Sequence, residues 1–431
     1  MGYLSTTMPI MAILLLAFSN VSAASLDLKK PLTLKDCIYT ALENSSKITI
    51  AKRSLTTAES GVKDARAGYL PRLDASADYK INDTYNKIAW TENQRDVRLS
   101  MTEIFYDNGN TTAQIKQAKA RLESATADFQ KIQDELTIEV IKSYYAFLKA
   151  QGMLKVKDEG LKQSQTHLNL AKARYEAGVA PKSDILKAEV EVSTAELGLI
   201  EAENTISLTQ ADLNNCLGID LDTPLLILDT KESEPIALTI DECLAYALKN
   251  RPEIKKAEIS LKIDEINLKL AQKEVLPIIT MAGNYNTNVD QFINERDWNK
   301  ASTWGIDIKV GFPIFDADKA KRGVTKATIN MENIKTNNSQ LEKDITLEVS
   351  RLYLTLKSQQ KMIETAKKQV VQAKESFDAA QGRYSSGVAP IIEVIDAQSS
   401  LNNASTNFVK AIYDYQMAIF SLKKAIGGQI L

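Results

Sequence analysis

The chain contains two similar copies of one sequence, and this duplication is the strongest constraint on its fold. Residues 32–79 match residues 238–285 at an offset of 206, and residues 174–218 match residues 383–427 at an offset of 209. Because the offset changes by only three residues, we interpret the second half as a copy of the first. We therefore divide the mature chain into a first repeat, 24–218, a linker, 219–237, and a second repeat, 238–431.

A Leu-Pro pair in each repeat, at residues 70–71 and 276–277, predicts the end of a helix and the start of extended chain. The alternation of apolar and polar residues that follows predicts strands at 72–82, 94–106, 278–289 and 303–315. In the last of these, one face carries Trp304, Ile306, Ile308, Val310 and Phe312. Polar tips at 84–93 and 291–300, which contain Trp90 and Trp298, are expected to join the strands.

Apolar residues at steps of three and four predict very long helices at 110–177 and 317–386, and shorter helices at 182–218 and 391–427. No Pro interrupts residues 110–176, and Gly152 and Gly160 are the only glycines inside that range. A helix of about 70 residues would be about 100 Å long. The fold class is therefore mainly α, built from long antiparallel helical hairpins.

The four strands exclude a simple coiled-coil rod. Each is long enough to span a bilayer at a tilt, yet four strands cannot close a barrel, and open strand edges cannot face lipid. Three chains would supply 12 strands and pair every edge. A periplasmic coiled-coil scaffold without a pore is the alternative that the helices alone leave open.

The N-terminus indicates export. Residues 1–23 contain an apolar run and end in Val21-Ser22-Ala23, a pattern typical of a cleaved signal peptide. Beyond Ala23 no stretch approaches the roughly 18 apolar residues of a spanning helix. The formal net charge of −2 gives no electrostatic reason to bind nucleic acid. We expect Cys37 and Cys243 to be small buried hydrophobes, because they occupy matching apolar helix faces.

The two turns RYEAGVAP, at 174–181, and RYSSGVAP, at 383–390, the Leu-Pro strand entries and the duplicated helix-hairpin-helix order together resemble the TolC-type outer-membrane efflux protein family. The likeness covers residues 32–427. It implies a homotrimer in which a 12-stranded outer-membrane β-barrel continues into an α-barrel tunnel across the periplasm. It also implies a location in the outer membrane, with contact to its lipid and most of the mass in the periplasm.

By the same resemblance, the protein is an exit duct of a tripartite efflux or type I secretion system. Its partners would be a periplasmic adaptor (membrane fusion) protein and an inner-membrane pump of the RND, ABC or MFS type. The duct would conduct drugs, metals or secreted protein passively.

The resemblance places the two turns at the periplasmic hairpin tips, where the adaptor docks. The docking residues it implies are Arg174, Tyr175, Gly178, Val179, Ala180, Pro181, Arg383, Gly387, Val388, Ala389 and Pro390. Gly178 and Gly387 suit positive φ at a helix end, and Pro181 and Pro390 suit the first turn of the next helix.

A periplasmic gate is expected beside the second turn. Glu393 and Asp396 lie three residues apart, so they share a helix face, and three chains would bring six carboxylates to one axis. The family implies that Glu393, Asp396 and Tyr384 form the gate and favour cations, with Asp184 a weaker candidate. Ala389 stands where a well-known member has an Arg that locks the gate. Simple helix capping is the alternative explanation of the turn residues.

No motif for catalysis, a metal or a cofactor is found, so we expect no enzyme activity. The single histidine, His167, is expected at a solvated or groove position in the middle of a helix.

Overall fold

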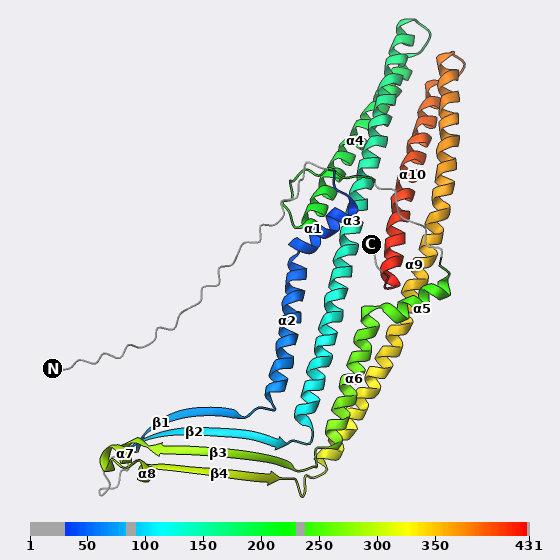
Figure 1. The fold of residues 1–431 in the computed structure, drawn as a ribbon. Coiled ribbons are helices and arrows are strands. Elements are labelled where there is room, and N and C mark those ends of the chain that lie inside the picture. Colours follow the sequence, from blue (N-terminus) through cyan, green and yellow to red (C-terminus); the bar gives the residue numbers. More distant parts are fainter. Residues whose placement is uncertain (1–30, 83–91, 230–237, 429–431) are drawn as a thin grey trace, which may run out of the picture.

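The computed structural model describes residues 31–82, 92–229 and 238–428. The predicted signal peptide, Trp90 and much of the linker lie outside these residues. The chain is long and narrow, with a sheet at one end and two helical hairpins at the other (Figure 1). In the described ranges, no helix combines the length and the apolarity needed to cross a membrane.

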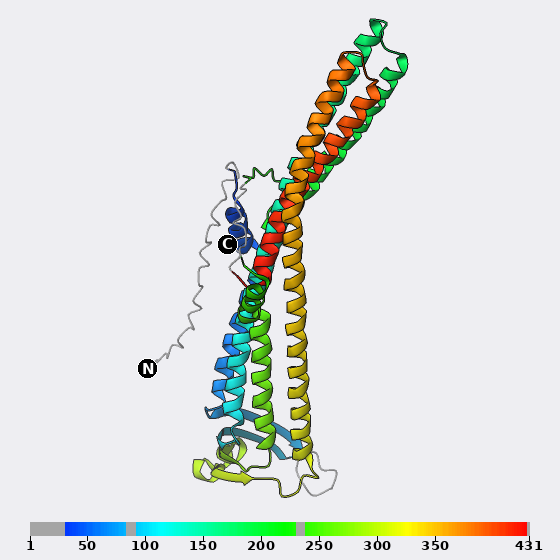
Figure 2. The same ribbon diagram turned by 90° about the vertical axis from the view of Figure 1, so that its right-hand side faces the viewer.

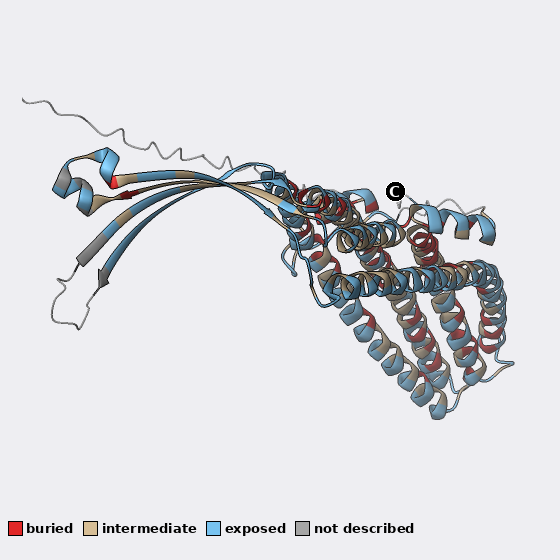
Figure 3. Cartoon of the chain, turned by 90° about the horizontal axis from the view of Figure 1, so that it is seen from below, coloured by how far each residue is buried: buried red, intermediate tan, exposed pale blue. Residues whose placement is uncertain are grey.

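The sheet is antiparallel, in the order β1-β2-β3-β4. Its strands are β1 (Arg72–Asn82), β2 (Glu92–Tyr106), β3 (Ile278–Asn288) and β4 (Ser302–Gly311). The two repeats meet where β2 pairs with β3. Their register aligns apolar side chains in one row across all four strands: Ala75, Leu99, Tyr285 and Trp304. One face of the sheet is therefore apolar, and Figure 3 shows that the sheet is curved.

The tip between β3 and β4 was expected to be polar, without an assigned secondary structure. It forms two short helices, α7 (Val289–Glu295) and α8 (Trp298–Ala301). Asp297 caps α8 by accepting a hydrogen bond from Asn299 N, and Trp298 stacks on Tyr285 with ring centroids 6.3 Å apart. These local contacts, which a polar composition does not reveal, support helix in place of loop.

Two helices of 67 residues run the length of the helical part, α3 (Asn110–Glu176) and α9 (Lys319–Ser385). Pairs of shorter helices lie end to end beside them: α2 (Ser46–Ala67) and α4 (Lys182–Leu217) along α3, and α6 (Pro252–Gln272) and α10 (Ile391–Ala425) along α9. The repeats join where α3 packs on α6 and α10. The predicted mainly α fold with paired hairpins and a small antiparallel sheet is confirmed. Figure 2 shows the hairpins leaning away from the axis of the lower helices.

Two short helices, α1 (Leu34–Asn44) and α5 (Ile240–Asn250), pack across the middle of the molecule. Each begins with a capping box, Thr33 with Asp36 and Thr239 with Glu242. Cys37 and Cys243 are buried on their inner faces, as predicted. Beside α1, the rings of Tyr144, Tyr145 and Phe420 fill the largest apolar cluster of the described chain.

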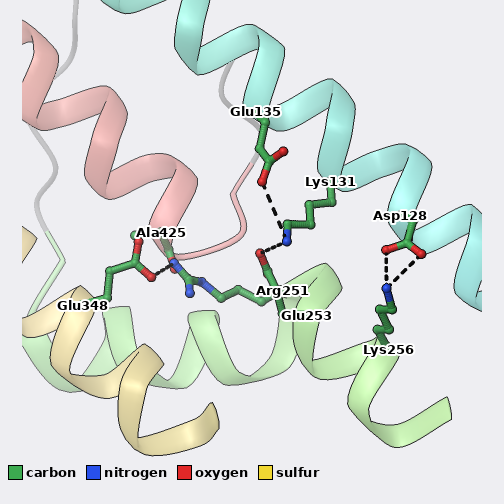
Figure 4. Close-up of polar contacts among 8 residues, drawn as sticks. All are labelled: Asp128, Lys131, Glu135, Arg251, Glu253, Lys256, Glu348 and Ala425. Atoms are coloured by element: carbon green, nitrogen blue, oxygen red, sulfur yellow. Dashed lines mark hydrogen bonds and ion pairs between the residues drawn. The ribbon is translucent and has the colours of Figure 1, made fainter. Parts of the chain in front are cut away.

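Each repeat fixes the end of its last helix with a residue at the C-terminal end of its short helix, α1 or α5. In the first repeat, Asn44 Nδ2 donates to the Leu217 carbonyl oxygen at 3.2 Å. In the second, Arg251 Nε donates to the Ala425 carbonyl oxygen at 2.6 Å, and its guanidinium lies 2.7 Å from Glu348 on α9 (Figure 4). Nearby, Lys256 pairs with Asp128 on α3. The two repeats thus cap the C-terminal carbonyl groups of α4 and α10 with different side chains.

Candidate functional site at the hairpin tips

The two turns have the same backbone. Two residues after the end of each long helix lies a glycine with positive φ, 75° at Gly178 and 78° at Gly387. The amide of Val179 donates to the Arg174 carbonyl at 2.9 Å, and that of Val388 to the Arg383 carbonyl at 2.9 Å. This hydrogen-bond pattern, with glycine in the left-handed region, is the Schellman motif. The duplicated sequence therefore gives duplicated turns.

Pro181 and Pro390 come immediately before the first residues of α4 and α10. Both are N-cap residues with extended backbone, ψ 155° and 157°, and not the first helical residue. Asp184 and Glu393 occupy the first turns of α4 and α10, where a negative charge is favourable to the helix dipole.

The side chain of Arg174 crosses from the first hairpin to the second. Its Nη1 donates to the carbonyl oxygens of Tyr384, at 2.6 Å, and Ser385, at 3.1 Å. Its guanidinium also lies over the Tyr384 ring, 4.9 Å from the centroid. Because the α9 C-terminus leaves carbonyl groups without helical partners, a cation there is well placed. One side chain thus ties the two tips together.

Its repeat counterpart, Arg383, behaves differently. It pairs with Glu393 of the same hairpin. Although Ala389 stands where an arginine was expected, the second hairpin still has a salt bridge, which Arg383 supplies. The negative charge of Glu393 is thus neutralised by an arginine of its own chain. Asp396, one helical turn further along α10, is exposed and has no ion pair in the described part of the chain.

The two copies of the turn tyrosine also differ. Tyr384 is 2% exposed and Tyr175 is 45% exposed. Tyr384 packs in a cluster with Phe377 of α9 and Ile391 and Val394 of α10. Burial raises the pKa of Tyr384, and the Asp184 carboxylate raises it further while Arg174 lowers it. Arg174, Asp184 and Tyr384 therefore form one group that spans both hairpins.

Of the predicted docking residues, most are open to solvent at the tips. Val179 and Val388 are strongly exposed apolar side chains. Tyr175, Pro181, Arg383 and Pro390 are also exposed, while Ala180 and Ala389 are half-buried. Arg174 is the member of this set that instead contacts the neighbouring hairpin.

The expectation for His167 was wrong, because this residue is 3% exposed, beside Phe377 of α9. A single-helix pattern does not tell which face of α3 a second hairpin covers. The spacing of Gly160, Ser164, His167, Ala171 and Arg174, in steps of four and three, was the missed signal. No group of three potential metal ligands occurs among the described residues.

Duplicated helical hairpins on a four-stranded sheet are the architecture of solved outer-membrane channels. The structure of CusC superposes with a TM-score of 0.82 at 18% identity, covering 92% of both chains. The Campylobacter jejuni CmeC outer membrane channel gives 0.79 at 17% identity, covering 92% of this chain and 85% of that one.

The chain belongs to the outer membrane efflux protein family, whose model matches residues 37–219 and 244–428. A relative, the outer membrane protein TolC of Vibrio cholerae, is 20% identical over 391 residues, which cover 90% of this chain and 89% of that protein.

Proposed function

We propose that the protein is the outer-membrane exit duct of an efflux or secretion system, and that it conducts substrates passively across the periplasm and outer membrane. One relative, 24% identical over 410 residues, is the toluene efflux pump outer membrane protein TtgC of Pseudomonas putida. An adaptor protein would dock at the tips, and an inner-membrane pump of the RND, ABC or MFS type would supply the energy.

The observation that carries the proposal is that the protomer ends in matching open edges. Its upper helices lie in the order α4, α3, α10, α9, its lower helices in the order α2, α3, α6, α9, and its sheet in the order β1 to β4. One side therefore presents α4, α2 and β1, and the other presents α9 and β4. A closed ring of copies pairs these edges, and three copies of four strands give a 12-stranded barrel.

The exposed side chains agree with that assembly. Trp304, Ile306 and Ile308 are exposed on the apolar face of β4, which suits contact with lipid. On the other face of the sheet, Arg98 of β2 donates to Asn286 of β3, and this polar face would line the lumen.

The function is tested by fractionation, crosslinking and conductance of the full chain. We expect a trimer in the outer membrane that opens pores in a planar bilayer. Ile306→Arg should block membrane assembly, because a cation facing lipid near the middle of a strand costs about 2–4 kcal/mol. Asp307→Arg, at the adjacent position on the other face, is the control and should assemble. Recovery as a soluble monomer without conductance would instead support the coiled-coil scaffold.

A further inference from the structure

The upper part of α3 meets the second hairpin through a row of small and polar residues. We call this row the polar seam: Gly160, Ser164, His167, Ala171 and Arg174 on α3, with Gln398 on α10. A Cβ atom added at Gly160 would lie 3.0 Å from the Asn402 side chain, so α3 and α10 approach closely here. The larger apolar cluster with Tyr144, Tyr145 and Phe420 lies lower on the same two helices. The hairpins are thus joined by an apolar contact near the middle and a polar one near the tips.

Gln398 holds the polar seam from the second hairpin. It is fully buried, and its Nε2 donates to the Gly160 carbonyl at 2.9 Å and to Ser164 Oγ at 2.8 Å. Its Oε1 has no hydrogen-bond partner among the described residues. Buried polar groups left without partners destabilise the state in which they are buried. Water that enters the polar seam would therefore donate the hydrogen bond that Gln398 Oε1 lacks.

His167 lies one turn closer to the tip. Neither its Nδ1 nor its Nε2 has a hydrogen-bond partner in the described part of the chain, and both atoms are buried. The ring packs edge-on against Phe377 of α9, with centroids 5.7 Å apart and an angle of 71° between the planes. In this environment a neutral imidazole has one donor and one acceptor without a hydrogen bond. An imidazolium would have two unsatisfied donors and also a buried charge.

The charged groups at this level of the helices do not relieve that cost. They are Lys162 and Lys172 on α3, Glu191 on α4, Lys374 and Asp378 on α9, and Asp396 on α10. All are exposed except Glu191, which is half-buried. Burial alone lowers the pKa of His167, and no charged side chain of the described residues contributes to that shift.

We infer that His167 is a proton-sensitive switch in the polar seam: uptake of a proton by its imidazole favours parting of the second hairpin from α3, because the imidazolium is hydrated only when the seam opens. Relative to the parted state, the closed seam is stable above the ordinary histidine pKa of about 6.5 and loses stability as the pH falls below it. Ala171 and Arg174 continue the same row to the tip, so parting at His167 loosens the Arg174 contact with Tyr384. The effect on conductance rests on the proposed duct function, whereas the parting itself does not.

The test measures the seam in the full-length trimer. Unnatural amino acids that carry spin labels replace the exposed Val179 and Val388, one on each turn. Excess unlabelled chain ensures that most of the labelled trimers contain a single labelled protomer. Lowering the pH from about 7.5 to about 5 should lengthen or broaden the distance between labels, and His167→Gln should abolish this change. Because His167 is the only histidine, the imidazole NMR signal of the unmutated protein should titrate over the same pH range as the distance.

The duplication supplies a matched control. Ser376 is the residue at the equivalent place in the second repeat, 209 positions after His167, and it is exposed. The double variant His167→Gln, Ser376→His should titrate its histidine without a change in distance. An acid-induced distance change that persists in His167→Gln, or an imidazole that titrates without any distance change, would overturn the inference. A distance change in a protein that conducts at neither pH would instead contradict the duct function and leave the switch standing.

Discussion

Arg174 Nη1 donates to the Tyr384 carbonyl oxygen at 2.6 Å, and this bond joins two hairpins that the chain separates by 210 residues. Its repeat counterpart, Arg383, makes no such crossing and pairs with Glu393 inside its own hairpin. The equivalent arginines of the two turns thus stabilise different contacts. The first arginine holds the tips together, and the second holds one tip in shape.

Arg174→Gln should loosen the contact between tips and raise conductance. A hydrogen bond to a charged group contributes about 1.5–3 kcal/mol, and the variant also removes the cation over the Tyr384 ring. Single-channel recordings in a planar bilayer measure the result. Lys172→Gln, an equal change of charge at an exposed position two residues away, is the control. Equal conductance in both variants would show that the crossing does not restrain the tips.

Asp396→Asn should reduce cation preference more than Glu393→Gln. Glu393 is already neutralised by Arg383, whereas Asp396 is exposed and unpaired among the described residues. The reversal potential in a salt gradient measures this preference, and the effect should shrink as salt rises, since exposed charges are screened over about 10 Å at 0.1 M. A double Ala variant at both positions with unchanged selectivity would exclude these carboxylates from the gate.

Arg251→Ala should lower the temperature of helix melting, followed by circular dichroism. It leaves the buried Ala425 carbonyl without its donor, a loss of about 1–3 kcal/mol. Lys256→Ala removes an exposed pair with Asp128 in the same region and should cost less than about 1 kcal/mol. Equal decreases in melting temperature for the two variants would show that burial of the Arg251 guanidinium does not add to the stability of the protein.

Gly152→Ala should separate α3 from α10. The added Cβ would lie 2.8 Å from a Val409 methyl group, and overpacking of this kind costs about 1–3 kcal/mol. Gly198→Ala is the matched control on α4, since its Cβ would meet only the flexible Lys157 side chain at 3.6 Å. That variant should gain up to about 1 kcal/mol from helix propensity. A destabilised Gly198→Ala protein together with an unaffected Gly152→Ala protein would contradict the close packing at Val409.

The local features of the tips follow from sequence. Two glycines in a repeated turn, acidic residues in the next helical turn and Leu-Pro before each pair of strands act over a few residues, so periodicity and capping rules suffice to predict them. The short helices α7 and α8 at the tip between β3 and β4 were not predicted, because helix formation there depends on a cap at Asp297 and a ring contact with Tyr285, not on composition.

The sequence by itself determined that the chain has two equivalent halves, each with a sheet-forming hairpin and a turn of fixed shape. It indicated that the copies differ in their acidic residues, but it did not determine how equivalent residues differ in burial and contacts, because these depend on their neighbours in the fold. Tertiary packing alone decided that Tyr384 is buried while Tyr175 is exposed, that Arg174 crosses between hairpins while Arg383 does not, and that His167 lies between them. The physical reason is that α3 lies inside the row of upper helices and α9 lies at its edge, so one face of a repeated helix is covered in one copy and open in the other.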